Sequence, residues 1–330
     1  MIEPLDLDPD SYDALIVSAF FDEVLADPDR LPLIIVRGAA PTLRAPGSLP
    51  VVVCYVGDEF GASGPSAADL VVGPADVDLL VERVRTAPIA ASALAVLLRT
   101  APATDVEHAL ASESAVYSLL QAGPEFDAWR RSTPRETIVD DRPTVRTIRD
   151  GGTLEIRLDR PHRHNAITAR LRDELHAALS GAVDDPDVTV VLSGEGPSFC
   201  SGGDLAEFGD RPDPATAHIV RTLRSPARRI HQLRDRIEAR IHGSTLGGGI
   251  EMASFAGRVV AAPDVRIALP EVGLGLIPGA GGTVGIPRRI GRQRTAALAI
   301  TGRAIDAATA AAWGLVDEIT GPTPSDQPRR

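Results

Sequence analysis

The chain has 330 residues, enough for two modest domains or one elaborated domain, and a formal net charge of −11. This negative charge excludes nucleic acid and anionic membrane surfaces as main partners. All 34 basic residues are arginine, so the chain has no lysine for a P-loop or for a Schiff base with pyridoxal phosphate. Cys54 and Cys200 are too few for a disulfide framework. The acidic N-terminus, without a signal-peptide core, and the lack of any apolar run of about 20 residues predict a soluble cytoplasmic protein.

The first part of the chain alternates helical and strand patterns. A helix is expected over residues 14–26, and short apolar strands over 32–36, 49–56 and 70–72. From residue 77 to residue 129 apolar side chains recur at helical spacing. Residues 131–143 are polar and contain two prolines, so we predict a linker there.

The alternation restarts after the linker. Strands are expected over 154–158, 188–192, 237–242 and 265–269, and helices over 169–179 and 215–233. A glycine-containing loop occupies 199–205. The pattern therefore predicts an α/β fold on both sides of the linker.

Three segments of the first part resemble segments of the second. Residues 27–29, 51–57 and 69–76 parallel residues 185–187, 236–243 and 258–264 in sequence and order. In this register Ala62 stands opposite Gly248 and Pro65 opposite Glu251. We therefore predict a duplication whose degenerate first copy, residues 1–85, has lost the chemistry. Chance similarity between two α/β segments is the alternative.

A run of glycines organises the second part. Gly247, Gly248 and Gly249 follow a strand and precede a helix, so their main-chain N–H groups are expected to face a ligand. Either a phosphate or the oxygen of a polarised carbonyl suits such donors. Glu251 would repel a phosphate, and Glu271 follows a second strand. The two carboxylates are therefore candidates for general acid and general base.

Four motifs of this part resemble the crotonase (enoyl-CoA hydratase/isomerase) superfamily, in the family's order. They are Asn165-Ala166, Phe199-Cys-Ser-Gly-Gly-Asp-Leu205, Gly243-Ser-Thr-Leu-Gly-Gly-Gly-Ile-Glu251 and Pro270-Glu-Val-Gly-Leu-Gly-Leu-Ile-Pro-Gly-Ala-Gly-Gly-Thr283. The resemblance covers about residues 143–320. It implies a spiral of ββα turns, here with residues 144–320 as the catalytic core, that binds acyl-CoA thioesters. It implies no further cofactor, because CoA is part of the substrate, and no metal.

The resemblance also implies roles for individual residues. The thioester oxygen would lie between the main-chain N–H groups of Gly203 and Gly248, an oxyanion hole. Of Glu251 and Glu271, one would activate water and the other would deliver the α-proton. The implied contacts to the substrate and its CoA are Arg163, His164, Ala166, Ser201, Gly202, Asp204 and Leu205, although Asp204 by itself is more typical of a loop cap.

Two departures from the family pattern lead to further predictions. Glu238 and Arg240 alternate onto one face of a strand, so they should pair or face water. The chain also stops soon after Val316, where the family continues into helices that cover the site and support trimerisation. Residues 86–130 resemble those helices. We predict that they pack near residues 305–319, in cis or from a neighbouring subunit of a homotrimer or hexamer, and that 321–330 is a disordered tail.

The favoured interpretation is an enoyl-CoA hydratase, a lyase of fatty-acid and lipid metabolism. Double-bond isomerisation or C–C bond hydrolysis on the same fold is one alternative. A non-catalytic acyl-CoA-binding subunit, suggested by the degenerate first copy, is another.

Overall fold

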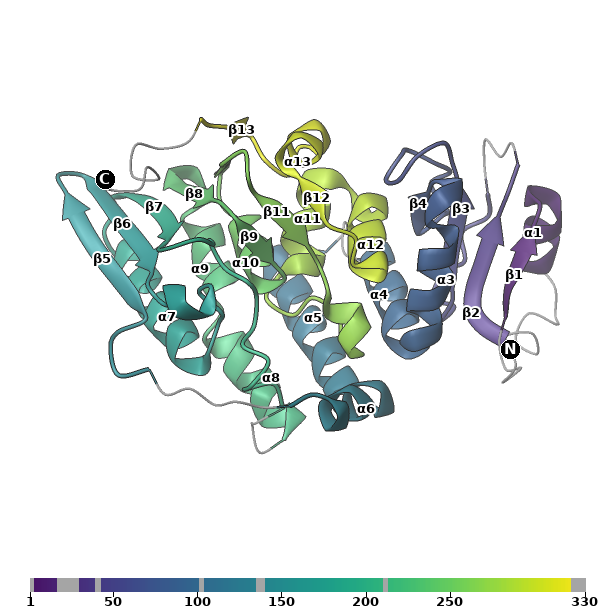
Figure 1. The fold of residues 1–330 in the computed structure, drawn as a ribbon, viewed down its shortest axis with the longest axis horizontal. Coiled ribbons are helices and arrows are strands. Elements are labelled where there is room, and N and C mark those ends of the chain that lie inside the picture. The colour runs from purple at the N-terminus through teal and green to yellow at the C-terminus, as the bar shows by residue number, and fades with distance from the viewer. Residues whose placement is uncertain are drawn as a thin grey trace.

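Two mostly parallel sheets lie at opposite ends of the molecule, with helices between them (Figure 1). The computed structural model describes residues 3–16, 30–38, 43–100, 104–134, 140–209 and 213–321. Most of the helix expected over 14–26, and nearly all of the expected tail, therefore lie outside the described residues. So does part of the expected linker, which follows the last helix of the helical segment.

The N-terminal sheet has four parallel strands in the order β1-β2-β3-β4. They are β1 (Glu3–Leu7), β2 (Arg30–Val36), β3 (Val52–Val56) and β4 (Leu70–Val72), with α1 (Pro9–Ile16) and α3 (Val77–Thr86) beside them. The apolar run of β2 is buried on both faces, as in parallel sheets covered on two sides. Leu33 and Ile35 join the main core, whereas Ile34 and Val36 pack with Tyr12 in a separate cluster.

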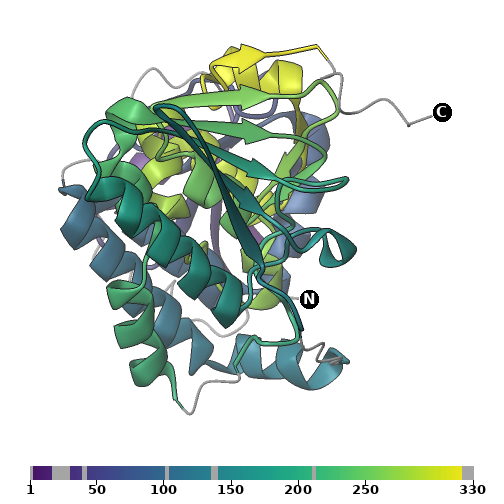
Figure 2. The same cartoon turned by 90° about the vertical axis from the view of Figure 1, so that its left-hand side faces the viewer.

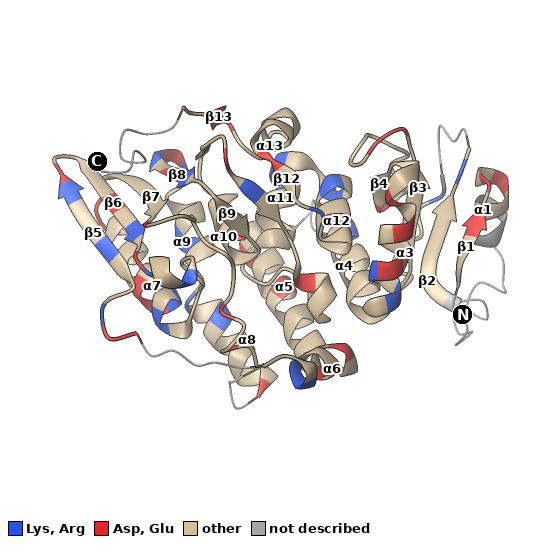
Figure 3. Cartoon of the chain, viewed as in Figure 1, with Lys and Arg blue, Asp and Glu red and all other residues tan. Residues whose placement is uncertain are grey.

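Three further helices form the expected helical segment. They are α4 (Pro88–Thr100), α5 (Val106–Gln121) and α6 (Pro124–Ser132). Asp105 caps α5 by accepting the N–H of His108. Glu125 of α6 accepts the main-chain N–H groups of Ile89 and Ala90 at 2.7 and 3.0 Å, so α6 caps the start of α4. Figure 3 shows charged residues on β5, at one end of the molecule, and on α3, beside the N-terminal sheet, and very little charge on α4.

The second sheet has six strands in the order β13-β10-β8-β7-β6-β5. All neighbours are parallel except the hairpin of β5 (Val145–Asp150) and β6 (Thr153–Leu158). The others are β7 (Thr189–Gly194), β8 (Ile237–Ile241), β10 (Arg258–Ala261) and β13 (Glu318–Ile319). Helix α7 (Ala169–Val183) lies across one face of this sheet and buries Leu171, Leu175 and Leu179 (Figure 2).

The remaining elements are a small third sheet and six helices. The sheet consists of β9 (Ser244–Leu246), β11 (Arg266–Ala268) and β12 (Ile305–Asp306). The helices are α8 (Pro214–Leu223), α9 (Pro226–Gln232), α10 (Gly248–Ala253), α11 (Gly282–Ile290), α12 (Arg292–Thr301) and α13 (Ala307–Trp313). A single helix was expected over 215–233, but it is broken before Pro226, whose ring and missing N–H do not suit a helix interior. Among the described residues no helix has the length and apolarity to cross a membrane.

The two large sheets share one topology. In the first, β1 is followed by α1 and then by the consecutive parallel neighbours β2, β3 and β4. In the second, β6 is followed by α7 and then by β7, β8 and β10 in the same neighbour order. A duplication requires this agreement, and a different strand order would have contradicted it. The division of the chain into two copies stays a prediction.

The upstream helices pack in cis, but on a different surface from the expected one. Helix α4 contacts α11 and α12, and α5 contacts α8 and α11. Buried Asp69, just before β4, binds Arg99 of α4 at 2.6 Å and Arg292 of α12 at 3.5 Å. Residues 305–319, the expected neighbours, instead place Trp313 against the ring of Phe60, with 6.0 Å between ring centroids.

Glu238 and Arg240, the charged residues on one face of β8, form an ion pair that is accessible to solvent. Arg240 donates to Glu238 at 2.7 Å, and Arg258 of the neighbouring strand binds the same carboxylate. Arg240 is 60% exposed. Neither charge is therefore buried alone.

Candidate active site

The glycine turn forms where the sequence places it. Gly247 has a φ of 45° and a ψ of −123°, and α10 begins at the next residue. A Cβ at position 247 would come within 2.1 Å of Glu271 Oε1. Glycine is therefore required there both for the backbone angle and for the close approach of Glu271.

Glu251, in α10, is 2% exposed. Its Oε2 accepts the main-chain N–H groups of Ala280 at 2.7 Å and Gly282 at 2.9 Å. Burial raises the pKa of Glu251 well above its ordinary value, and the nearby carboxylates of Glu271 and Glu113 raise it further. The side chain is thus held in place while its ionised form is disfavoured.

Glu271 begins a short 3-10 helix (Glu271–Leu274) after β11 and is 8% exposed. Its Oε2 is buried and has no hydrogen-bond partner within the described part of the chain. Burial raises the pKa of Glu271 from 4.5 to about 8. An unpartnered oxygen with a raised pKa is available to exchange a proton with a ligand.

The loop 199–205 is fixed by main-chain hydrogen bonds on both sides. Cys200 donates to Ser244 at 3.2 Å and accepts from Leu246 at 2.9 Å, while Ile167 donates to Gly202 at 2.8 Å. The main-chain N–H groups of Gly203 and Gly248 have no protein acceptor among the described residues. Both residues line one cavity, so two main-chain donors are available to a ligand there.

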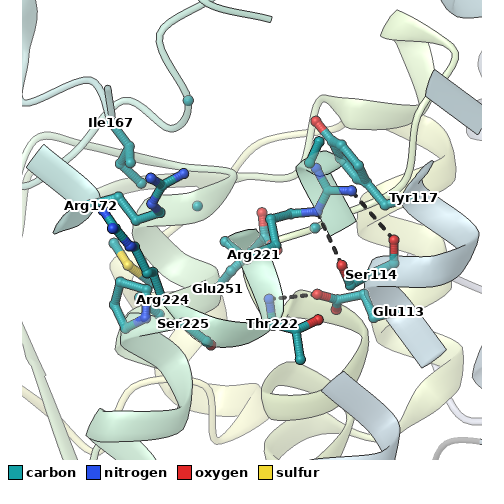
Figure 4. A pocket seen from close by; sticks show the side chains of 18 of the residues that line it. Glu113, Ser114, Tyr117, Ile167, Arg172, Arg221, Thr222, Arg224, Ser225 and Glu251 are labelled. Carbon is teal, nitrogen blue, oxygen red and sulfur yellow. Dashed lines mark hydrogen bonds between the residues drawn. The ribbon is translucent and has the colours of Figure 1, made fainter. Parts of the chain in front are cut away.

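Glu251 and Glu271 line the same cavity as these two glycines. The wall is completed by residues of α5, α8 and α9 and by the loop around Ile167. Figure 4 shows Glu113 and Tyr117 on one side of it and Ile167 and Arg172 on the other, with Glu251 and Arg221 between them. The arrangement brings two acidic side chains and two free amides to one space. Among the described residues no three potential metal ligands gather.

Asp204 also lines the cavity, but it is tied to a buried arginine. Arg160, which is 1% exposed, donates to Asp204 Oδ2 at 2.7 Å and to Asp140 Oδ2 at 2.8 Å. Asp204 Oδ1 accepts the N–H of Ala206 at 3.1 Å. These contacts show that Asp204 has a structural role and holds the loop. A loop cap is the role that its position in the sequence suggests.

The other residues expected to contact the substrate lie beside the cavity and are not part of its wall. Arg163 is 3.9 Å from Asp204, and His164, with a φ of 52°, contacts Ser198 at 2.9 Å. Ser201 donates its N–H to the carbonyl of His164 at 2.9 Å. Ala166 is buried, Gly202 belongs to the loop framework, and Leu205 is exposed. Their contact with CoA stays a prediction.

Glu113, Tyr117 and Arg221 line the cavity and were not among the expected site residues. Arg221 of α8 lies over the ring of Tyr117, 4.5 Å from its centroid, and donates to Ser114 Oγ at 3.2 Å. One signal in the sequence could have indicated Glu113. It shares the buried face of α5 with Leu110, Tyr117 and Leu120, where a carboxylate needs a specific partner.

Comparison with known proteins identifies the family and the fold. The family model for enoyl-CoA hydratase/isomerase matches residues 149–326, more than half of the chain. The chain belongs to the enoyl-CoA hydratase/isomerase family. Its crotonase fold is shared with the enoyl-CoA hydratase structure from Thermoplasma volcanium, at 34% identity and a TM-score of 0.51, covering 54% of this chain and 72% of that one.

Curated members of the family are similar over the same region. Enoyl-CoA isomerase/hydratase fer4 of Mycosarcoma maydis is 36% identical over 51% of this chain and 65% of its own. Probable enoyl-CoA hydratase echA8 of Mycobacterium bovis is 33% identical over 53% of this chain and 68% of its own. The chain thus spans about two thirds of the length of these relatives.

Proposed function

We propose that this family member hydrates 2-enoyl-CoA thioesters. The observation that carries the proposal is the meeting of Glu251, Glu271 and the amides of Gly203 and Gly248 at one cavity. The oxygen of water would bond to C3, and a proton would be delivered to C2. The two amides would stabilise the negative charge that develops on the thioester oxygen, and one such donor is typically worth about 3 kcal/mol.

The electrostatics of the two glutamates favour an acid and a base in one site. Burial disfavours ionisation of both, and Glu271 further raises the pKa of Glu251. The state in which two nearby buried carboxylates share one proton is then favoured over the state in which both are ionised. The ionised member would take a proton from water, and the protonated member would give one to C2. This division of roles needs no redox cofactor, because water addition is not a redox reaction.

Isomerisation of the double bond is the alternative on the same fold, and the relative fer4 is named for both activities. Isomerisation moves a single proton between carbons, which one carboxylate can do. It would therefore leave either Glu251 or Glu271 dispensable. The hydration proposal requires both.

The test is the loss of crotonyl-CoA absorbance with wild type, Glu251→Gln and Glu271→Gln, against a panel of 3-enoyl and cyclic acyl-CoA thioesters. Hydration predicts a large fall in kcat for both variants with unchanged circular dichroism. Activity restricted to the 3-enoyl or cyclic substrates would favour isomerisation or C–C cleavage. A chain that binds acyl-CoA without turning any of them over would be the non-catalytic subunit.

A further inference from the structure

Two carboxylates hold the turn of residues 280–283, and each of them accepts every second main-chain N–H group along the turn. Ala280 and Gly282 donate to Glu251 Oε2 at 2.7 and 2.9 Å. Gly281 and Thr283 donate to Glu113 Oε1 and Oε2 at 2.7 and 2.9 Å. The hydroxyl of Thr283 gives Glu113 a third hydrogen bond, at 2.7 Å. The backbone that orients Glu251 is therefore itself fixed by Glu113.

The turn has little freedom to move without carrying Glu251 with it. Gly281 has a φ of 106°, and a Cβ at position 282 would lie 2.7 Å from Glu251 Cγ. Glu113 is 2% exposed and approaches from α5, which packs on α11 directly behind the turn. Without the Glu113 carboxylate, the buried N–H groups of Gly281 and Thr283 would lack their acceptor. The turn would then shift to find others.

We propose that Glu113 is a positioning residue, whose carboxylate sets the turn of residues 280–283 so that its other two amides aim Glu251 at the substrate. The proposal rests on the proposed catalytic role of Glu251. Under this proposal the segment upstream of the linker contributes a residue on which the function of the site depends. The charge of Glu113 also contributes to the raised pKa of Glu251, after burial and Glu271.

A purely structural Glu113 would have a different signature. Glu113 would then anchor α5 on α11, and its loss would lower stability while the folded fraction kept its kcat. A positioning residue instead affects the chemical step. A displacement of a catalytic group by about 1 Å can cost about 100-fold in rate.

The experiment measures kcat, KM and the pH profile of kcat with crotonyl-CoA for Glu113→Gln, Glu113→Asp and Thr283→Val. Glu82→Gln on α3, which is exposed and pairs with Arg85, is the matched control. We expect both Glu113 variants to lose about 10- to 100-fold in kcat with KM within about threefold. The Thr283 variant, which keeps the main-chain donors, should lose less. The profile of Glu113→Gln should move to lower pH, because a negative neighbour of Glu251 is gone, whereas Glu113→Asp keeps that charge.

Wild-type kcat and pH profile in Glu113→Gln would overturn the proposal, whatever its melting temperature. If Glu113→Gln does not fold, an unchanged kcat in both Glu113→Asp and Thr283→Val would do the same. Should the wild type turn over no acyl-CoA, the proposed function fails, and the titration of Glu251 by carboxyl-carbon NMR decides instead. An identical Glu251 titration in wild type and Glu113→Asp would then refute positioning, and a displaced titration, with the charge of residue 113 retained, would support it.

Discussion

The ring of Tyr117 on α5 lies directly against Gly279, so that a Cβ at position 279 would come within 2.3 Å of its Cδ2. Gly275 approaches α6 in the same way, with its Cβ position 2.5 Å from the main-chain nitrogen of Phe126. Trp129 of α6 packs edge-on against Phe208, whose own ring covers Gly203. The short 3-10 helix of Glu271, the turn that binds Glu251 and the loop that contains Gly203 are therefore packed on helices from the other side of the linker.

Gly279→Ala should destabilise the protein, by about 1–3 kcal/mol, because Tyr117 has to move out of a packed position. Gly181→Ala is the control: position 181 lies in α7 with nothing within 4 Å of its Cβ, and the same substitution there should stabilise by about 0.5–1 kcal/mol. Urea unfolding of both variants measures the difference. Equal stabilities would show that Tyr117 does not constrain this turn.

Gly247→Ala should abolish most activity by displacing Glu271, since the added Cβ would sit 2.1 Å from Glu271 Oε1. The positive φ of Gly247 would add backbone strain of about 1–3 kcal/mol. Gly291→Ala separates the two effects, because Gly291 has a φ of 80° but nothing within 4 Å of its Cβ position. We expect both variants to be less stable and only Gly247→Ala to lose kcat. A fully active Gly247→Ala would argue against a catalytic Glu271.

Stability should fall as the pH rises from about 4.5 to about 8. Burial raises the folded-state pKa of Glu271 to about 8 and that of Glu113 to about 7, from an ordinary 4.5. In this interval the folded state binds more protons than the unfolded state, so the free energy of unfolding decreases with pH. Their contribution is complete below pH 4.5 and lost once both groups ionise. Denaturation at a series of pH values measures the slope, which Glu271→Gln should reduce. A free energy of unfolding that instead increases with pH over this interval, equally in wild type and Glu271→Gln, would contradict the raised pKa of Glu271.

Arg160→Met should cost about 3–5 kcal/mol, because it removes the buried cation that bridges the carboxylates of Asp140 and Asp204. Adding Asp204→Asn to Arg160→Met should recover part of the loss. Arg146→Met breaks an exposed pair with Asp159 and should cost about 0–1 kcal/mol. Thermal unfolding compares the three. If Arg160→Met and Arg146→Met have the same melting temperature, the ion pair with Arg160 does not hold Asp204 in place.

The sequence predicted what depends on local pattern. The β-branched runs of β2 and β4 read as buried strands, and the glycines at 247–249 read as the turn that forms. The approach of Glu271 to this turn followed from a family resemblance, since nothing local in either segment specifies it. The break between α8 and α9 was signalled by Pro226 but was not predicted.

The contacts of Glu113 could not be predicted from the sequence. Glu113 binds Gly281, 168 residues further along the chain, and no spacing within either segment encodes that contact. The resemblance of residues 86–130 to helices that cover the site predicted that they pack near residues 305–319. It did not predict the surface they use or the carboxylate they supply. Long-range pairing of this kind depends on the packing of α5 against α8 and α11.

Residues 1–134 and 140–330, produced as separate chains, should be inactive alone and active when co-expressed. The 140–330 fragment lacks Glu113 and Tyr117 and exposes the apolar faces of α11 and α12 that α4 and α5 cover. Co-expression restores every described contact except the covalent link at 135–139. Co-purification and crotonyl-CoA hydration measure assembly and activity, with the intact chain as reference. A soluble 140–330 fragment with the kcat of the intact chain would mean that the site is complete without the upstream helices.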